Sequence, residues 1–479
     1  MKQENRPLVR ALQTFKSQEP ISFHVPGHKH GLLSDLPDEL GKALTYDVTE
    51  LSGLDDLHEP EGVIQEAEEL LSTLYQSNQS FFLVNGSTVG NLAMIYATCQ
   101  ANDTIIVQRN AHKSIFNAIE LTGARPVLLS PPWDEYTRTP GILTLSQVKE
   151  ALVAYPDAKG IVLTYPTYYG VVGEGLRKII ELCHERSIPV LVDEAHGAHF
   201  IAGRSFPDSA LEAGADVVVH SAHKTLPAMT MASYLHVKSN IVSVDRIAHY
   251  LTMLQSSSPS YLLMASLDDA RAYVQSYTLE DERYFMNTRK FFIDKLRELQ
   301  NIEVVETDDP LKLLIRKKGY SGFSILSEFE KQGIFAELAD PFQVLLVLPL
   351  LKEKTNYMYE ESVERIKRAV RRLNEKDMEE EAEVILLDEG ISTLSYPIQE
   401  LNGMKKEWRP MDQAEGCIAA SSIIPYPPGI PLLIGGERVT EKHIKRLEQY
   451  LRLQAKFQGA IRIEERQIEV AVIDGGISC

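Results

Sequence analysis

From residue 63 to about residue 240, the sequence alternates short apolar runs with amphipathic stretches. Runs of four to six residues rich in Val, Ile and Leu are typical of buried β-strands. The predicted strands are residues 81–84, 104–108, 126–130, 160–164, 189–194, 216–220 and 233–237. Helical patterns lie between several of them, for example over residues 90–100, 112–124 and 174–187. Near-continuous apolar strands joined by helices predict an α/β fold with a mostly parallel sheet covered on both faces.

After about residue 244 the pattern becomes mainly helical, and residues 279–300 read as one long amphipathic helix. Further strand-like runs at 302–306, 311–317 and 342–350, with a helix over 321–333, predict a second, smaller α/β unit. A charged helical stretch follows, and its acidic end, Glu379–Glu381, is interpreted as a solvated face or linker. The last segment predicts a helix over residues 440–455 and a final pair of strands.

These changes of pattern divide the chain into four predicted parts. They are an N-terminal arm or interface segment (1–62), a large domain (63–300), a small α/β domain (301–375) and a C-terminal domain (376–479). The first part is the least regular, with Pro, Gly and His concentrated in residues 24–31 and more irregular sequence in 50–60. Long irregular segments are often functional, but a surface arm explains this composition equally well.

Composition narrows the class of partner. The net charge of −18 argues against a nucleic-acid or anionic-membrane surface as the main partner. No apolar run reaches the ~20 residues needed to cross a bilayer, and the N-terminus lacks the apolar core of a signal peptide. The four cysteines are far apart in the sequence, which predicts isolated thiols in a reducing compartment. We therefore expect a cytoplasmic protein with neither a nucleic-acid nor a membrane partner.

Polar residues follow several predicted strands directly, where ligands bind in parallel sheets. Ser87 and Thr88 stand between a strand and a helix, so that their hydroxyls and the helix N-terminus could form a phosphate cup. Helix capping explains the same two residues without a ligand. His112 follows the next strand, where its ring could stack on a flat cofactor, and Thr167 follows a later one.

Asp193 ends one apolar run, and Lys224 lies just after another. A carboxylate at a strand end can keep a pyridine nitrogen protonated, and a lysine amine can form a Schiff base. Alone, each residue has an ordinary alternative: the acid caps a helix, or the lysine is simply solvated. Together they lead to the hypothesis that the cofactor is pyridoxal 5′-phosphate (PLP).

A metal site is the rival interpretation of the same region. His196 and His199, then His220 and His223, are spaced three residues apart and could bind a metal with Asp193, as in a metal hydrolase. This spacing does not match the i, i+4 helical pair of zinc proteases. A metal also leaves Lys224 and the Ser-Thr pair without a role, so no metal is predicted.

Eight motifs carry a family resemblance. In chain order they are HVPGHKHG, DVTELSGLDDLHEPEG, FFLVNGSTVGN, QRNAHKS, YPTYYG, VLVDEAHGAH, HSAHKT and PYPPGIPLLIGGE, from about residue 23 to 437. With them the sequence resembles the Orn/Lys/Arg decarboxylase family of fold type I PLP-dependent enzymes, and in particular short bacterial members without the wing domain. The resemblance implies a large domain with a mostly parallel sheet and smaller α/β C-terminal domains.

The resemblance also implies roles for individual residues. Lys224 forms the Schiff base with PLP, Asp193 pairs with the pyridine nitrogen, and His112 stacks on the ring. Ser87, Thr88, Ser221 and His223 hold the phosphate, while His196 lies beside the ring and Thr167 near its phenolic edge. Lys224, His112, Asp193 and His196 are thus the expected catalytic residues. The distal cation of the substrate is assigned to Glu437, with Asp55 and Asp56 as further acidic residues near the pocket.

The implied reaction is decarboxylation of arginine, lysine or ornithine to the corresponding amine and CO2. Its physiological role stays open between polyamine biosynthesis, acid stress and specialised metabolism. The sequence does not select among the three substrates. The resemblance further implies a homodimer with shared active sites, or a higher oligomer, in which the irregular N-terminal segments complete the partner's pocket. Two alternatives stay open: a PLP enzyme of another reaction type, either an aminotransferase or an aldol-type lyase, and a non-catalytic PLP-binding homologue.

Overall fold

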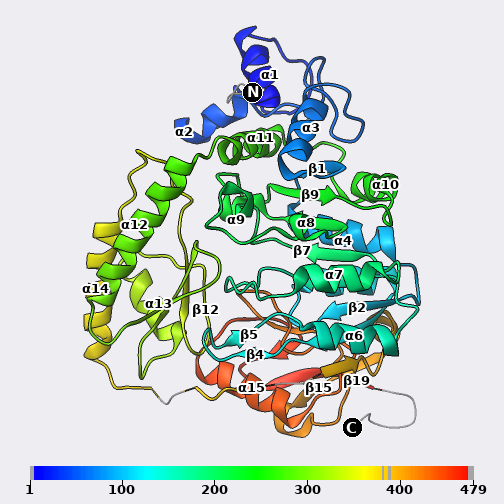
Figure 1. Ribbon diagram of the computed structural model, residues 1–479, viewed down its shortest axis with the longest axis vertical. Helices are drawn as coiled ribbons and strands as arrows, with labels where there is room; N and C mark the ends of the chain where they lie inside the picture. The colour runs from blue at the N-terminus through cyan, green and yellow to red at the C-terminus, as the bar shows by residue number, and fades with distance from the viewer. Residues whose placement is uncertain (1–4, 380–381, 387–389, 473–479) are drawn as a thin grey trace. The chain divides into compact units, whose positions relative to one another are not determined.

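The computed structural model describes residues 5–379, 382–386 and 390–472 (Figure 1). The chain forms two compact units, each built from two stretches of sequence. Unit 1 comprises Met1–Thr98 and Cys183–Thr278, and unit 2 comprises Cys99–Leu182 and Leu279–Cys479. One helix, α7 (Leu176–His184), contains the boundary at Cys183.

Unit 1 contains four sheet strands in the order β1-β9-β8-β7. They are β1 (Gln79–Leu83), β7 (Val190–Asp193), β8 (Val217–His220) and β9 (Ser233–Val237). β7 and β8 are parallel, whereas β9 runs antiparallel to both β8 and β1. All four strands were predicted. The apolar pattern did not show the reversed direction of β9, because a strand buried on both faces reads the same in either direction.

Helices surround these strands. The helices of unit 1 are α1 (Pro7–Ser17), α2 (Asp38–Gly41), η1 (Lys42–Thr45), α3 (Val63–Tyr75), α4 (Gly86–Thr98), η2 (Phe200–Ala202), α8 (Ala210–Ala213), α9 (Ala222–Thr225), α10 (Val244–Leu254) and α11 (Tyr261–Gln275). α4 packs against β8 and β9, and α10 packs against α4 (Figure 1). At Gly90 of α4, a Cβ atom would lie 2.8 Å from Leu83 Cδ1 and 2.9 Å from Val219 Cγ1. Glycine is therefore required for α4 to approach the sheet this closely.

The segment between α1 and α3 is largely irregular, as predicted, and exposes several large apolar side chains. Ile21 is 87% exposed, Phe23 97% and Leu32 82%. Apolar side chains this exposed contribute nothing to the stability of the unit on their own. Their clustering in one segment leaves an exposed apolar surface.

Unit 2 contains the remaining three predicted strands, β6, β2 and β3, and a further strand, β14, in the order β6-β2-β3-β14. They are β2 (Thr104–Gln108), β3 (Arg125–Ser130), β6 (Ile161–Thr164) and β14 (Gly390–Thr393). β2 is parallel to both β3 and β6, and β14 adds an antiparallel strand beside β3. Helices α5 (Lys113–Thr122) and α6 (Leu145–Ala154) and the small hairpin β4 (Trp133–Asp134) and β5 (Thr139–Pro140) accompany these strands.

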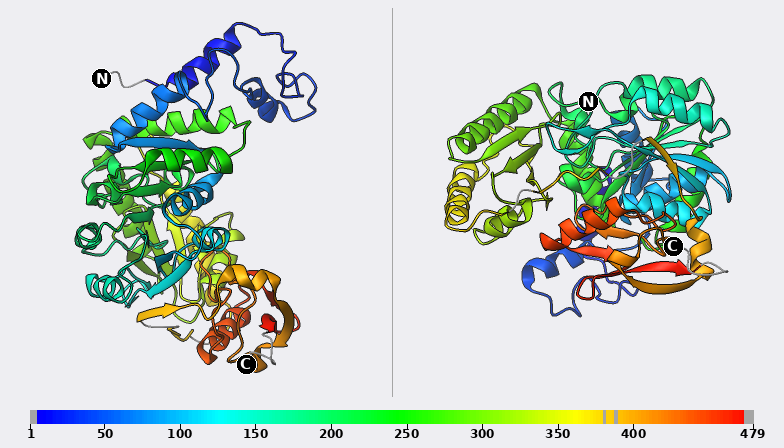
Figure 2. Two further views of the ribbon diagram at one scale, coloured as in Figure 1. Left: turned by 90° about the vertical axis from the view of Figure 1, so that its right-hand side faces the viewer. Right: turned by 90° about the horizontal axis from the view of Figure 1, so that it is seen from below.

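The predicted second α/β element of unit 2 is an antiparallel sheet in the order β10-β11-β13-β12. Its strands are β10 (Glu303–Glu306), β11 (Lys312–Arg316), β12 (Leu338–Ala339) and β13 (Val344–Val347). Helices α12 (Leu279–Arg297), α13 (Gly322–Glu330) and α14 (Tyr359–Asn374) accompany it, with α12 and α14 side by side (Figure 2). α12 is 19 residues long and charged, and no helix in the described ranges is both long and apolar enough to cross a membrane.

The acidic stretch after α14 was predicted to be a solvated face or linker, but Glu379 in this stretch makes specific hydrogen bonds. Its Oε2 accepts a hydrogen bond of 2.7 Å from the Ser321 amide, and its Oε1 accepts one from the Ser324 hydroxyl. Both donors lie at the start of α13, where free N–H groups attract a carboxylate. Glu379 therefore caps that helix, while Glu380 and Glu381 lie outside the described residues.

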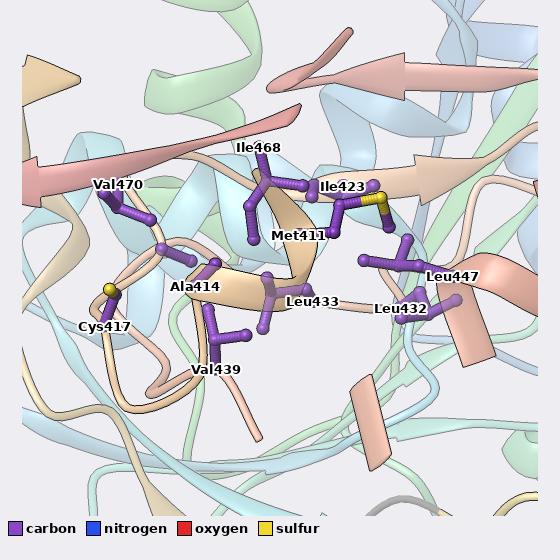
Figure 3. Close-up of a cluster of buried hydrophobic side chains, with 11 residues drawn as sticks. Met411, Ala414, Cys417, Ile423, Leu432, Leu433, Val439, Leu447, Ile468 and Val470 are labelled. Carbon is purple, nitrogen blue, oxygen red and sulfur yellow. The ribbon is translucent and has the colours of Figure 1, made fainter. Parts of the chain in front are cut away.

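The C-terminal part of unit 2 has its own apolar cluster, in which the side chains of Ile423, Leu433 and Ile468 lie together (Figure 3). Its elements are η3 (Ile398–Gly403), β15 (Lys405–Pro410), η4 (Met411–Gln413), β16 (Ile423–Pro425), α15 (Glu441–Arg452), β17 (Phe457–Gly459), β18 (Ile461–Arg462) and β19 (Gln467–Val472). β18 and β19 form the predicted final pair of strands. Cys417 belongs to this cluster, and among the described cysteines Cys99 and Cys183 form no disulfide.

Candidate active site

Lys224 and His196 meet in unit 1. Lys224 lies on the short helix α9, directly after β8, and His196 lies in the segment after β7. Lys224 Nζ is 3.1 Å from His196 Nε2, and His196 is only 3% exposed. Because parallel strands bring their carboxyl ends to one edge, two residues 28 positions apart reach hydrogen-bonding distance. The pair can hold and exchange a proton at the Lys224 amine.

Asp193 is the last residue of β7 and is 4% exposed. Its Oδ2 accepts a hydrogen bond of 3.0 Å from Asn91 Nδ2, and its Oδ1 accepts one of 3.2 Å from the Ala195 amide. Burial raises the pKa of Asp193, while the Lys224 ammonium and the Asn91 amide act in the opposite direction. A desolvated carboxylate of this kind gains most from a further cationic partner, as a protonated pyridine would be.

Asn91 is a site residue that the motif analysis missed. It is 1% exposed and lies four residues after Ser87 on α4. Residues four apart share one side of a helix, so the face that carries Ser87 also carries the partner of Asp193. That spacing was the only signal in the sequence.

Ser87 and Ser221 come from distant stretches of unit 1 and meet at the start of α4. The Ser221 hydroxyl donates to Ser87 Oγ at 2.7 Å. Two hydroxyls at the N-terminus of a 13-residue helix fit an anionic group such as a phosphate. Thr88, predicted for the same cup, is exposed, and His223 Nδ1 lies 3.0 Å from the Ala232 carbonyl oxygen.

The four histidines of the metal hypothesis do not converge. His196 contacts Lys224, and His199 packs edge-on against Phe200 and Phe206. His220 Nε2 is 2.7 Å from Glu194 Oε2, and both of these side chains are fully buried. No group of three or more His, Cys, Asp or Glu side chains suited to a metal ion occurs in the part of the chain that the structure describes.

In unit 2, His112 is the N-cap of α5 and lies against the proline-rich PYPPG segment. Its Nδ1 lies 2.8 Å from Ser114 Oγ and also accepts from the Ser114 amide. Gly429 has a φ of +94°, and a Cβ at this position would lie 3.1 Å from both Cδ2 and Nε2 of the His112 ring. The amide of Lys113 also donates to the Gly429 carbonyl at 3.0 Å. Two motifs more than 300 residues apart in sequence therefore position one imidazole.

Thr167 lies in unit 2 and closes a tight turn after β6. Its Oγ1 accepts from the Val171 amide at 3.1 Å, and its own amide donates to the Val171 carbonyl at 2.9 Å. The neighbouring residues Tyr168 and Tyr169 pack into the apolar cluster of the β10–β13 sheet. The YPTYYG motif is thus anchored on the smaller sheet of its unit.

Glu437 makes a buried bidentate ion pair with Arg109. Arg109 Nε donates to Glu437 Oε1 at 3.0 Å, and Nη2 donates to Oε2 at 2.9 Å. The Ile434 amide donates to Oε2 as well, at 2.7 Å. The remaining Arg109 donors bind the carbonyl oxygens of Pro431 and Leu432. Glu437 therefore fastens Arg109 to the C-terminal segment, a role that differs from the expected contact with a substrate cation.

Asp55 has a structural role at the start of α3. Its two carboxylate oxygens accept five backbone N–H bonds, from Asp56, Glu61, Gly62, Ile64 and Gln65. Burial raises the pKa of Asp55, but these N–H donors together outweigh burial and leave its pKa lowered. By contrast, Oδ1 of Asp56 accepts from the His58 amide at 2.8 Å, and Oδ2 accepts no hydrogen bond from the residues that the structure describes. Among the three acidic residues expected near the substrate, Asp56 has the most freedom to bind a ligand.

The fold is that of solved lysine decarboxylases. The crystal structure of the Francisella novicida lysine decarboxylase LdcF superposes with a TM-score of 0.78 at 19% identity, over 98% of this chain and 81% of that one. At this identity the similarity establishes the fold, which confirms the predicted α/β class, fold type I.

Sequence comparison then gives the family. The family models for the Orn/Lys/Arg decarboxylase major domain and C-terminal domain match residues 6–307 and 393–461. An arginine decarboxylase of Bacillus subtilis is 34% identical over 475 residues, covering 96% of both chains. An uncharacterised protein of the same organism, YaaO, is 49% identical over 485 residues, covering 98% of this chain and 99% of that protein. This chain belongs to the Orn/Lys/Arg decarboxylase family.

Proposed function

We propose that the protein is a PLP-dependent decarboxylase that converts a basic amino acid (arginine, lysine or ornithine) to its amine and CO2. The observation that carries the proposal is the arrangement in unit 1 of Lys224 beside His196 and of a desolvated Asp193 held by Asn91. Membership of the decarboxylase family supports the same reaction.

The residues of unit 1 fit PLP by their chemistry. When bound, PLP supplies an electron sink for the bond that breaks at the substrate α-carbon. Asp193 would hold the pyridine nitrogen in its protonated form, Lys224 would provide the amine for covalent attachment, and the Ser87 and Ser221 hydroxyls would bind the phosphate. Thr88, His223, His112 and Thr167 stay proposals as further cofactor-binding residues, on the strength of the family resemblance alone.

The proton chemistry falls to Lys224 and His196. After CO2 leaves, the α-carbon must receive a proton, and an amine 3.1 Å from an imidazole can deliver one and be recharged. Because His196 is buried, it would transfer its proton to Lys224 and not to bulk water. This arrangement favours protonation at carbon over side reactions with solvent.

Arginine is the first substrate to test, because a relative at 34% identity over nearly the whole chain is an arginine decarboxylase. The distal guanidinium or ammonium needs a carboxylate partner. Asp55 and Glu437 have both carboxylate oxygens engaged, so Asp56 is the remaining candidate of the three.

We also propose that the enzyme works as a homodimer with shared active sites, or as a higher oligomer. The irregular segment between α1 and α3 supports this, since Phe23 is 97% exposed and Leu33 72% exposed. A second copy would bury this apolar surface. A cytoplasmic location and a role in polyamine biosynthesis complete the proposal.

The experiment is a panel of amino acids incubated with PLP-loaded protein, with amine products and CO2 read by mass spectrometry. A basic amine from one of the three substrates is the expected product, and Lys224→Ala should remove both this product and the visible Schiff-base absorption. Release of CO2 by Lys224→Ala at the normal rate would overturn the proposal. Keto-acid or aldehyde products without CO2 would instead favour transamination or aldol-type cleavage, and a cofactor band without turnover would favour a binding protein.

A further inference from the structure

A cavity lies within unit 1 and shares no lining residue with the candidate cofactor site. Its volume is about 240 Å³, and residues of α3, β1, α10 and the segment before α3 line it. Most of the wall is apolar, including Leu57, Phe81 and Leu251, and Glu68 is the acidic residue among the lining side chains. A carboxylate in an apolar chamber needs an explanation, because desolvation of a charge is costly.

Glu68 has one engaged oxygen and one available oxygen. Oε1 accepts a hydrogen bond of 2.8 Å from the Phe82 amide. Oε2 has no hydrogen-bond partner among the described residues, although the whole side chain is only 2% exposed. Since Glu68 lines the cavity, this second oxygen is the polar group that the cavity offers to a ligand.

Part of the role of Glu68 is structural. β1 is the terminal strand of the unit 1 sheet, so the amides on its outer side need partners from side chains. Glu68 accepts a hydrogen bond from the Phe82 amide, and Gln255 Oε1 accepts one of 2.8 Å from the Val84 amide. A glutamine at position 68 would serve this purpose equally well and without a charge. The edge strand alone therefore does not account for an acid.

The electrostatic surroundings of the cavity favour a cation. Burial, opposed by the hydrogen bond from the Phe82 amide and assisted by the nearby Asp55 carboxylate, raises the pKa of Glu68 to about 8. His58 is the other titratable lining residue, and its Nε2 lies 2.9 Å from the Ser256 carbonyl oxygen. The lining residues of α10 and β1 carry no titratable group. No positively charged lysine or arginine lines the cavity within the described residues.

We propose that this cavity binds a small primary alkylammonium ion, with its charged head on Glu68 Oε2 and its methylene chain against Leu57, Phe81 and Leu251. A divalent metal ion fits poorly, because it requires about six oxygen ligands and the walls are mainly apolar. A zwitterionic amino acid fits poorly too, because its carboxylate would face Glu68 with Asp55 close by. The inference does not depend on the proposed reaction.

The test uses isothermal titration calorimetry of the PLP-loaded protein with n-butylammonium chloride, and with n-butanol as the neutral analogue. We expect saturable binding of the amine and at least tenfold weaker binding of the alcohol. Glu68→Gln keeps the acceptor for the Phe82 amide and should weaken amine binding at least tenfold. Ala248→Leu, which fills the cavity from α10, should do the same while leaving Glu68 in place.

Two further features separate this site from the cofactor site. Amine that binds at Lys224 should bind the Glu68→Gln and Ala248→Leu variants as well as it binds the wild type. The binding heat that the wild type shows and both variants lack therefore measures binding in the cavity. Below a pH of about 8, the affinity should rise about tenfold per pH unit, because Glu68 must lose its proton before the amine binds. No saturable amine binding by the folded wild-type protein, or equal binding of amine and alcohol, would reduce Glu68 to an edge-strand cap and overturn the proposal.

Discussion

Lys224 Nζ and His196 Nε2 lie 3.1 Å apart, although they follow different strands of the unit 1 sheet. If this contact recharges the Lys224 amine during turnover, His196→Phe should lower kcat by about 10²-fold or more, which is the usual contribution of a positioned acid–base group. The Schiff-base absorption should persist, since Lys224 itself is unchanged. Steady-state kinetics and a visible spectrum on one preparation measure both effects.

His199→Phe is the matched control, because His199 lies in the same loop and packs edge-on against Phe200 and Phe206. Its kcat should stay within a few-fold of wild type. Equal losses in both variants would mean that the loop, and not the proton of His196, limits turnover.

Asp55 and Asp56 are adjacent, but we expect their substitutions to act differently. Asp55→Ala removes the acceptor of five backbone N–H groups and should lower the free energy of unfolding by about 1–2 kcal/mol, as for other helix caps. Its lowered pKa means that this stabilisation is present above the unfolded value of 3.8 and is lost as the pH falls through the folded value. Urea denaturation at pH 7 and at a pH well below 3.8 should show the difference between the two proteins shrinking in acid.

Asp56→Ala should leave stability nearly unchanged and raise KM if Asp56 binds the distal cation of the substrate. The same change in KM for Asp55→Ala, at full stability, would contradict the assignment of Asp55 as a helix cap.

The Arg109–Glu437 pair should behave as one buried unit. Removing either partner leaves an uncompensated buried charge, so Arg109→Met and Glu437→Met should each lower the free energy of unfolding by about 3–5 kcal/mol. The double variant should be more stable than the sum of the two losses predicts, because both charges are then gone. Chemical denaturation of the four proteins measures this coupling, and additive losses would exclude it.

Gly429→Ala should distort the surroundings of His112. The position has a φ of +94°, which L residues rarely adopt, and a Cβ would stand 3.1 Å from the imidazole. We expect a loss of about 1–3 kcal/mol in stability and weaker PLP retention, measured by denaturation and by cofactor titration. Gly403→Ala is the control, because a Cβ there meets nothing within 4 Å.

Glu68 predicts a pH dependence of stability with a definite sign. The folded state keeps its proton up to a pH of about 8, whereas the unfolded chain loses it near 4.5. Between these values the folded state binds more protons, so stability falls as the pH rises, by up to about 5 kcal/mol from this group. Glu68→Gln should not show this fall. Denaturation of both proteins at pH 5 and pH 8.5 checks it, and parallel pH profiles would refute the raised pKa.

Local pattern predicted the elements of this protein well. The runs that became β2 and β9 match the predicted residues 104–108 and 233–237, because an apolar run bounded by turns defines a strand within itself. Asp193 and Lys224 were found for a related reason, since each follows a recognisable strand. The direction of β9 was not predictable, because pairing partners are set by contacts between distant segments.

Three acids make contacts that the sequence did not predict. Asp55, Glu379 and Glu437 were each interpreted from their charge, as ligands for a cation or as solvated residues. In the structure each accepts hydrogen bonds from backbone N–H groups, and Glu437 adds a guanidinium. A carboxylate and the helix or loop end that it caps need not be neighbours in sequence. The periodicity of the sequence therefore does not reveal such capping contacts. Asn91 was missed because Asp193, the acid that it binds, lies 102 residues away, and the spacing of Asn91 from Ser87 does not reveal that contact.

Unit 1 is assembled from two stretches of sequence separated by Cys99–Leu182. β1 from the first stretch pairs only with β9 from the second stretch in the sheet of this unit. Ser87 likewise forms its hydrogen bond with Ser221, which lies 134 residues later in the chain. During synthesis, the first stretch therefore leaves the ribosome with an unpaired strand and a helix whose apolar side has no sheet to cover. Translation must continue beyond residue 237 before this half can close. A chain stopped earlier would present an open strand edge, which makes nascent fragments of this protein natural clients for chaperones.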